Sequence, residues 1–492
     1  MKPITQFNHV DANKTAIMLD GLRFSYGRLA ADVASLAAWL TGQGVVAGQR
    51  IGIFFGNPYW SWVCRFAALR MGLTQATLAA RNFREQTAAT GLFDVALGDF
   101  QRVDGTDIAR QVIAFSPRTM APFAEQFEVA APARCQTDPL AEASATCLML
   151  TSGTTGKSRV VALSAEVLRS RLAPLQSHQG LSAGTYLLST AGSNTMPGFG
   201  YSLATWQAGG CVMFTTSRSG LRQLQTNLLV TTPAELQDLL NMGQEPWDNR
   251  EGRKVIVAGG RLPVPVRDEA LARVCCQVSL DYGATETNCT ATGDASLLDR
   301  HPGAVGYAVK DAVIQVVDRN GHPQPPGKEG VVRTHTPYMV TEYAGAQTNN
   351  EDEIFRDGWF YPGDLGVMFE DGLLAITGRL SETLNVSGTK IPLLDFEASL
   401  KNLSAIRDSC AIALKLDDGD KLAFLVVCDD PVDLHALSEQ IASRLPFQVR
   451  FNMLRVLEIP RNAMGKIPRN ALSEAYTEIY RRETSRTMHE RE

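Results

Sequence analysis

The chain has 492 residues, and its 47 Lys and Arg against 52 Asp and Glu give a formal net charge of −5 at pH 7. This length predicts roughly two to four domains, while a hydrophobic fraction of 45% excludes wholesale disorder. The mild acidity argues against a nucleic-acid partner, and no apolar stretch reaches the ~20 residues that would span a bilayer. We therefore expect a soluble, cytoplasmic globular protein with no nucleic-acid partner and no membrane span.

The nine cysteines and seven histidines are dispersed along the chain, with no C-x-x-C or H-E-x-x-H spacing among them. An odd, scattered set of cysteines is not typical of a disulfide framework or a zinc site. The sequence therefore predicts neither disulfides nor a structural metal.

The first third alternates helical and extended patterns. Apolar residues over 29–40 recur at steps of four, three and four, which is typical of one helix face. The run 51–55 predicts a buried strand, and 60–71 predicts a second helix that ends at Gly72. Strand, helix and strand in this order indicate parallel α/β layers. Residues 101–146 are less regular and are expected to form connecting loops.

The pattern of predicted elements changes twice in the remaining chain. An apolar strand over 147–150 leads into a polar loop, and another over 254–258 leads into two glycines. Many glycines, prolines and short extended runs between 302 and 378 indicate a β-rich subdomain. After Arg379 the patterns predict a small α/β domain, with helices over 393–402 and 432–444 and strands over 411–416, 422–427 and 451–457.

The clearest local motif is the loop 151–159, Thr-Ser-Gly-Thr-Thr-Gly-Lys-Ser-Arg. Its two glycines permit unusual backbone angles and its hydroxyl groups can donate to anionic oxygens, which after a strand predicts a phosphate-binding loop. The end of the loop resembles a Walker A motif, but Thr151 stands where that motif needs its first glycine, so the pattern fails. A flexible surface loop is the alternative.

Four further features follow in order. The segment 281–286, Asp-Tyr-Gly-Ala-Thr-Glu, supplies an aromatic ring for a base, a hydroxyl for a phosphate and a carboxylate for Mg²⁺. Asp364 can accept hydrogen bonds from two ribose hydroxyls, although turn capping is the commoner role of such a residue. Arg379 follows closely, and Lys466 comes after a glycine near the C-terminus. Each motif is weak alone, and together they indicate nucleotide chemistry.

These motifs resemble those of the adenylate-forming superfamily, which includes acyl-CoA synthetases, aryl-acid ligases, peptide-synthetase adenylation domains and luciferases. The resemblance begins at 24–29, Phe-Ser-Tyr-Gly-Arg-Leu, and ends at 460–467, Pro-Arg-Asn-Ala-Met-Gly-Lys-Ile, so it covers nearly the whole chain. It implies an α/β fold with a large N-terminal AMP-binding domain over 1–380, built of layered α/β subdomains plus the β-rich subdomain. A small, mobile α/β C-terminal domain would occupy 381–492 and carry Lys466.

The resemblance implies an AMP-forming acid–thiol ligase. A carboxylate attacks the α-phosphate of ATP and pyrophosphate leaves; the C-terminal domain then rotates, and a pantetheine thiol takes the acyl group. ATP and Mg²⁺ are therefore the expected cofactors, with CoA or the phosphopantetheine of an acyl or peptidyl carrier protein as the acceptor.

The resemblance also implies a role for each matching residue. Catalysis is expected of Lys466, which would bridge the substrate carboxylate and the α-phosphate, of Thr285 at the α-phosphate, and of Glu286 as the Mg²⁺ ligand. The other contacts to ATP are expected from Thr151, Ser152, Gly153, Thr154, Thr155, Gly156, Arg159, Gly260, Tyr282, Asp364 and Arg379. The hinge falls on Ser381, and the acid pocket is expected to be lined by Asn194, Pro197, Phe199, Gly259 and Gly283.

Several positions depart from the family pattern. Arg159 keeps a cation where the family has Pro-Lys-Gly, and Ser381 stands where the family has Asp or Lys. The stretch 193–200 contains no acidic residue, so a fatty or aryl acid is favoured over an α-amino acid. Asn194 matches a substrate-reading Asn of aryl-acid ligases or caps a turn, and Phe199 lines the pocket or packs in the core.

Two other functions remain open. A P-loop-type kinase or NTPase would use the loop 151–159, but Thr151 and the Lys466 motif count against it. A non-catalytic nucleotide-binding member of the same fold would keep the ATP contacts, with Lys466 as an ordinary solvated lysine.

Overall fold

The computed structural model describes residues 4–5, 7, 9–78, 93–99, 109–114, 120–126, 142–151, 159–345, 354–386, 389–397, 400, 403, 405–416, 419–428, 433–445, 449–461 and 467–489. The chain divides into two compact units. The first comprises Met1–Thr151, Ser158–Ile314 and Thr334–Phe360, and the second comprises Ser152–Lys157, Gln315–Arg333 and Tyr361–Glu492. The domain border expected at residue 380 stays a prediction.

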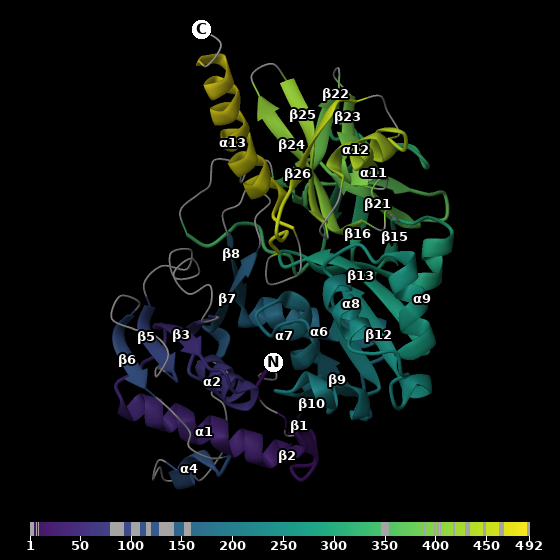
Figure 1. Ribbon diagram of the computed structural model, residues 1–492. Helices are drawn as coiled ribbons and strands as arrows, with labels where there is room; N and C mark the ends of the chain where they lie inside the picture. The colour runs from purple at the N-terminus through teal and green to yellow at the C-terminus, as the bar shows by residue number, and fades with distance from the viewer. Residues whose placement is uncertain are drawn as a thin grey trace. The chain divides into compact units, whose positions relative to one another are not determined.

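The first unit begins with a six-stranded sheet in the order β6-β5-β3-β4-β7-β8 (Figure 1). Its strand pairs are parallel except for the β7–β8 hairpin. The predicted helices and strand are confirmed here, and the less regular stretch 101–146 also contains β6 and α4. The elements are α1 (Tyr26–Gly42), α2 (Pro58–Arg70), α4 (Phe123–Gln126), β3 (Arg50–Phe54), β4 (Thr74–Thr77), β5 (Phe93–Gly98), β6 (Ala109–Ala114), β7 (Thr146–Thr151) and β8 (Arg159–Ser164).

A second sheet of the same unit runs in the order β15-β14-β13-β12-β11-β9-β10-β1-β2. Its central strands are parallel, whereas β2, β14 and β15 pair antiparallel with their neighbours. The strands are β1 (Thr15–Leu19), β2 (Leu22–Ser25), β9 (Tyr186–Ser189), β10 (Cys211–Phe214), β11 (Leu228–Thr231), β12 (Lys254–Ala258), β13 (Gln277–Ala284), β14 (Asn288–Asp294) and β15 (Ala304–Ala308).

Helices cover this second sheet. Every residue of β11 and all of β12 but its first residue are buried, as expected for parallel strands with both faces covered. The α/β prediction is confirmed by these layers. The helices are α6 (Ala165–Gln179), α7 (Met196–Gln207), α8 (Pro233–Asn241) and α9 (Val264–Arg273), with 3₁₀ turns η3 (Arg218–Gln223), η4 (Arg250–Gly252) and η5 (Ala295–Asp299), and a hairpin of β18 (Phe355–Arg356) and β19 (Trp359–Phe360) completes the unit.

Local sequence fixes where the helices next to the site begin. The Ser164 side chain accepts a hydrogen bond from Val167 N and so caps α6, directly after β8. Thr195 caps α7 in the same way by accepting from Gly198 N. At α8 the Thr232 and Glu235 side chains form a capping box. Each cap satisfies backbone donors that a helix start leaves without partners.

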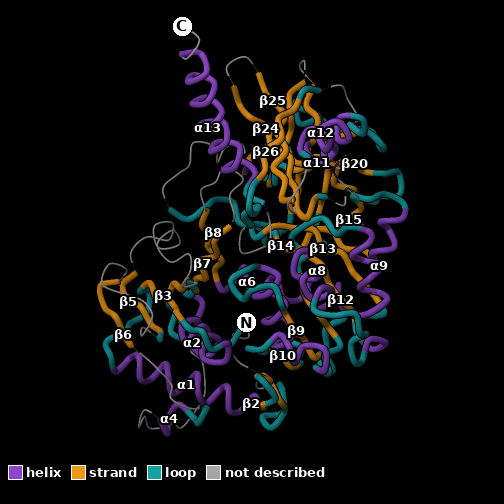
Figure 2. The backbone as a smooth tube through the Cα atoms, viewed as in Figure 1, coloured by secondary structure: helices purple, strands orange, loops and turns teal. Residues whose placement is uncertain are grey.

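The second unit is built on a three-stranded sheet of β24, β25 and β26 (Figure 2). Alternate residues of β24 and β25 belong to two hydrophobic clusters. One cluster packs the sheet against α11 and α12, and the other packs it against α13. Helices and strands predicted after Arg379 are found among the elements of this unit. The elements are β20 (Asp364–Met368), β21 (Leu374–Arg379), β22 (Thr383–Val386), β23 (Thr389–Pro392), β24 (Ile406–Leu416), β25 (Gly419–Cys428), β26 (Phe451–Arg455), α11 (Leu393–Glu397), α12 (Leu434–Ala442) and α13 (Arg469–His489), while the chain passes between the units within β16 (Val313–Val317) and β17 (Glu329–His335).

Hydrogen bonds from the Tyr26 side chain link α1 to the end of α7 and to the residue before β10. Its side chain is buried, and its hydroxyl donates to Gly210 O at 2.5 Å and to Trp206 O at 3.2 Å. Removing this donor leaves two buried carbonyl groups with one partner fewer.

We expect Tyr26→Phe to lower the free energy of unfolding by about 1–3 kcal/mol, the cost of buried polar groups that lose a partner. Denaturant titration of the purified protein measures this. Tyr186→Phe is the control, because Tyr186 is 40% exposed and should change stability by less than ~0.5 kcal/mol. Equal effects of the two variants would contradict the role given to the Tyr26 hydroxyl.

Candidate functional site

The site is built at the carboxyl edge of the parallel strands β12 and β13. Ala258 pairs with Asp281, so the glycines that follow β12 lie beside the segment that begins at Tyr282. The carboxyl ends of parallel strands are where ligands bind in open α/β sheets. The register thus brings together two motifs that are more than 20 residues apart in the sequence.

Gly283 allows the backbone to change course at this edge. A Cβ atom at this position would lie 2.0 Å from Asn288 O, which is far inside contact distance. The pairing of β13 with β14 is irregular between Tyr282 and Gly283. The tight turn that carries Thr285 and Glu286 therefore depends on a residue without a side chain.

The two ends of the predicted phosphate-binding loop are held in one hairpin. Thr151 at the end of β7 is paired with Arg159 at the start of β8. The predicted residues between them, Ser152, Gly153, Thr154, Thr155 and Gly156, lie outside the described residues. The Arg159 guanidinium lies over the Tyr343 ring, 5.2 Å from its centroid.

Glu286 and Arg159 both contact Tyr343. Glu286 is 5% exposed, and the Tyr343 hydroxyl donates to its Oε1 at 2.7 Å. Burial, and then the charge of Glu286, raise the pKa of Tyr343 above its usual range. Ala344 N also donates to Val160 O at 2.7 Å, which ties this segment to β8. The structure therefore brings a cation, a phenol and a carboxylate together, and the sequence did not single out Tyr343.

Arg171 on α6 is a second residue that the sequence did not single out. Its side chain is 0% exposed and donates to the carbonyls of Thr285 and Glu286, both at 2.7 Å, and of Tyr338 at 3.1 Å. Burial lowers its pKa to about 10, so it remains charged at neutral pH. The sequence did contain one indication that Arg171 is buried. Its spacing places it on the same helix face as Leu168, Leu172 and Leu175.

A buried carboxylate lies behind the same turn. Asp281 accepts hydrogen bonds from Gln179 Nε2 and Thr292 Oγ1, both at 2.8 Å, and from the Tyr201 hydroxyl. Burial raises the pKa of Asp281, and these donors oppose that shift. The contacts join α6, α7 and β14 to the end of β13.

The predicted acid pocket falls partly on α7. Asn194 and Pro197 are half-buried around the start of the helix. Phe199 is 2% exposed and stacks on Trp62 with ring centroids 5.5 Å apart, while the Arg65 guanidinium lies 5.3 Å from the Phe199 ring. Its ring therefore packs in the core, the alternative that the sequence left open, and its contact with a substrate stays a prediction.

The second unit holds the predicted ribose-binding pair. Asp364 on β20 and Arg379 on β21 are paired across the two strands, with Arg379 Nε 2.9 Å from Asp364 Oδ1. Ser381 lies exposed in the turn after β21, and its role as a hinge stays a prediction. Lys466 lies outside the described residues. The structure thus orients the Asp364 carboxylate through its ion pair with Arg379.

The described residues show no ready-made metal cage. None of them form a group of three or more His, Cys, Asp or Glu side chains that could hold an ion. A single carboxylate fits Mg²⁺ nevertheless, because this ion is usually held by one or two carboxylates together with waters and substrate phosphates. Glu286 can supply that carboxylate. Within the described part of the chain, no helix is long and apolar enough to cross a membrane.

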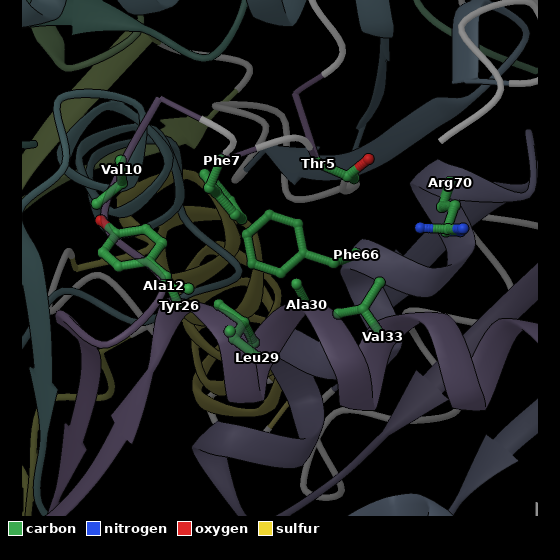
Figure 3. Close-up of a pocket in the computed structure, with 11 residues that line it drawn as sticks. Thr5, Phe7, Val10, Ala12, Tyr26, Leu29, Ala30, Val33, Phe66 and Arg70 are labelled. Atoms are coloured by element: carbon green, nitrogen blue, oxygen red, sulfur yellow. The ribbon is translucent and has the colours of Figure 1, made fainter. Parts of the chain in front are cut away.

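A cavity of about 350 Å³ lies elsewhere in the first unit, between α1, α2 and the N-terminal segment (Figure 3). Phe7, Tyr26 and Phe66 are among the residues that line it, with Arg70 also on its wall. Of the described residues around this cavity, none belongs to the predicted site.

The chain is similar to known proteins over most of its length. The family model described as AMP-binding enzyme matches residues 5–344. The chain is 24% identical to the fatty acid–[acyl-carrier-protein] ligase ScoC of Streptomyces coeruleorubidus, with 94% of this chain and 93% of that protein covered. It is 23% identical to the vibriobactin-specific 2,3-dihydroxybenzoate-AMP ligase of Vibrio cholerae, with 94% and 90% covered.

A solved structure shares the architecture. ATP-bound MatB from Rhodopseudomonas palustris superposes with a TM-score of 0.82 at 25% identity, with 97% of this chain and 100% of that chain covered. The expected fold is confirmed by this likeness over the whole chain.

We expect Gly283→Ala to lower the free energy of unfolding by about 1–3 kcal/mol or more, because the new methyl group overlaps Asn288 O. Gly260→Ala is the matched control in the bend after β12, since its Cβ would meet only Pro233 at 3.4 Å. Thermal or denaturant unfolding of both variants provides the measurement. A Gly283→Ala variant as stable as Gly260→Ala would show that the turn can move without cost.

Proposed function

Because the chain belongs to the AMP-binding enzyme family and is an AMP-forming acid–thiol ligase, we propose that it activates a fatty or aryl acid as an acyl-adenylate and transfers the acyl group to a pantetheine thiol. The observation that supports this most directly is the convergence of Arg159, Tyr343 and Glu286 beside the end of β13. A cation at the end of a hydroxyl-rich loop and a carboxylate near it suit a nucleoside triphosphate and its divalent ion.

The chain's own groups divide the work of holding ATP. Thr151 and Thr285 offer hydroxyl donors to phosphate oxygens, and Arg159 offers a guanidinium at the loop's end. Glu286 would hold Mg²⁺, which supplies charge neutralisation to the leaving pyrophosphate. The Tyr343 hydroxyl donates a hydrogen bond to Glu286 Oε1. Among the described residues no hydrogen-bond donor reaches Glu286 Oε2, so this oxygen is available to the proposed ion.

The base and the sugar would be bound by separate elements. Tyr282 is proposed to lie against adenine, next to Gly259 and Gly260 at the end of β12. Asp364 is proposed to accept from the ribose hydroxyls, and its ion pair with Arg379 keeps the carboxylate oriented. In the proposed mechanism the C-terminal domain, residues 381–492, turns about Ser381 between the two half-reactions.

Lys466 is proposed to stabilise the adenylation transition state. A carboxylate and an α-phosphate repel each other as they approach, and a lysine ammonium between them offsets the charge that develops. Removing such a group from a transition state commonly costs ~10²–10³-fold in rate. This role is available only if the segment that carries Lys466 reaches the carboxyl edge of β13.

The choice of a fatty or aryl acid is supported by two observations. No acidic residue lies in 193–200 to pair with an α-amine, and Asn194 lies half-buried beside the cap of α7. One similar protein is a ligase for fatty acids and another for an aromatic acid. The acceptor is proposed to be CoA or a carrier protein, because both present the same thiol. Nothing in the comparisons supports a P-loop kinase.

We expect ATP–pyrophosphate exchange that depends on a carboxylic acid, measured across fatty, aryl and amino acids with Mg²⁺. Lys466→Ala should lower the exchange rate by ~10²–10³-fold while ATP still binds. Lys421→Ala is the control, because Lys421 lies on the same unit and contacts Tyr480. ATP binding without exchange for any acid would contradict the proposed function, and acid-dependent release of γ-phosphate would favour the kinase.

Once an acid supports exchange, the acceptor can be identified by trapping. The enzyme, ATP and the radiolabelled acid are mixed with CoA or with a phosphopantetheinylated carrier protein, and thioester is measured for each. We expect thioester with at least one acceptor, because both present the thiol on the same flexible arm. Release of free acid and AMP with neither acceptor would contradict the thiol-transfer step.

A further inference from the structure

We propose that Arg171 is a positioning residue for adenylation: its guanidinium fixes the backbone on both sides of Glu286 and so sets the direction in which this carboxylate is presented to Mg²⁺ and ATP. The proposal rests on the function proposed above for Glu286. It assigns to a buried arginine a task distinct from contact with the substrate.

Arg171 is a buried cation whose hydrogen-bond partners are neutral groups. Its nitrogens donate to three backbone carbonyls, and Nη1 also lies 3.7 Å from Met196 Sδ. Among the described residues, no carboxylate lies within ion-pair distance of it. A planar guanidinium presents five N–H donors in a rigid fork, so it holds carbonyls of two segments in a fixed geometry, whereas the three donors of an ammonium group rotate.

Two of these carbonyls determine the conformation of one residue. The Thr285 carbonyl belongs to the peptide plane before Glu286, and the Glu286 carbonyl belongs to the plane after it. Because Arg171 holds both at 2.7 Å, neither plane can rotate freely, and φ and ψ of Glu286 are fixed. The direction of the Glu286 side chain follows from these angles.

Further bonds hold the same turn. Val340 N donates to Glu286 O at 2.9 Å, and the Arg171 Nε bond to Tyr338 O fixes the segment from which this amide comes. The Tyr343 hydroxyl then holds Glu286 Oε1 from the same segment. Arg171 thus orients Glu286 in two ways, through its own backbone and through the segment 338–343.

The chain offers a matched control in Arg253. This arginine is also 0% exposed and also donates to backbone carbonyls, those of Thr226, Leu224, Asp248 and Val274. None of these residues belongs to the predicted site. A lysine at position 253 removes a similar set of bonds and tests the general cost of losing a buried arginine.

The experiment compares Arg171→Lys, Arg171→Gln and Arg253→Lys with the wild-type chain. Exchange is measured against Mg²⁺, ATP and acid concentrations, and Mg²⁺-dependent ATP binding is measured by calorimetry without acid. We expect the Arg171 variants to lower kcat for exchange by about 10–100-fold, as a misplaced catalytic group does, and to raise the half-saturating Mg²⁺ concentration. The KM of the acid should stay within about twofold. Arg253→Lys should lower stability only.

Wild-type kcat and Mg²⁺ dependence in folded Arg171→Lys and Arg171→Gln would overturn the proposal. The same kinetic changes in Arg253→Lys would also overturn it, since the effect would then be general. Failure of both Arg171 variants to fold would assign this residue to stability and count against positioning. If the wild-type chain shows no exchange with any acid, the proposed function fails, and the calorimetric Mg²⁺ dependence still tests Arg171.

Discussion

The site depends on one turn, residues 284–287, being held in a single conformation at the end of a parallel strand. Three neighbours impose this: Gly283 lets the backbone pass close to Asn288, Arg171 grips two consecutive carbonyls, and the Tyr343 hydroxyl holds the Glu286 carboxylate. Without these contacts, buried polar groups of the turn would lack hydrogen-bond partners, which would destabilise the turn and leave the carboxylate without a fixed direction. The β7–β8 hairpin and the end of β12 can contribute to one ligand site only while this turn keeps its conformation.

The charged groups around this turn are the second feature of the site. The Glu286 carboxylate is buried, and two cations, Arg159 and Arg171, contact groups next to it. Arg171 contacts its backbone from the buried side, and Arg159 lies over the tyrosine that donates to it. Among the described residues neither arginine forms an ion pair with Glu286, so in the proposed function no such pair competes with a ligand for this carboxylate.

Most of the fold could be predicted because its elements follow simple periodicities. The strand at 254–258 and the helix over 29–40 appear where the apolar pattern placed them, and the family is confirmed by the match over 5–344. Helix α13 was missed because only Leu472, Tyr476 and Tyr480 form its apolar stripe in an otherwise charged segment. Arg171 and Tyr343 were missed for a different reason: their partners are backbone or distant groups that only the folded chain brings near. The roles of Lys466, Ser381 and the acid-pocket residues stay predictions.

In the proposed function, this turn and the loop 151–159 hold ATP while a carboxylate oxygen of the acid joins its α-phosphate. The most direct measurement uses an acid labelled with ¹⁸O in its carboxylate, in a single turnover with ATP and a thiol acceptor, followed by mass spectrometry of the products. The account predicts one labelled oxygen in AMP, because the acceptor attacks the carbonyl carbon and leaves the bridging oxygen on phosphorus. Unlabelled AMP, or label in inorganic phosphate together with ADP, would contradict it.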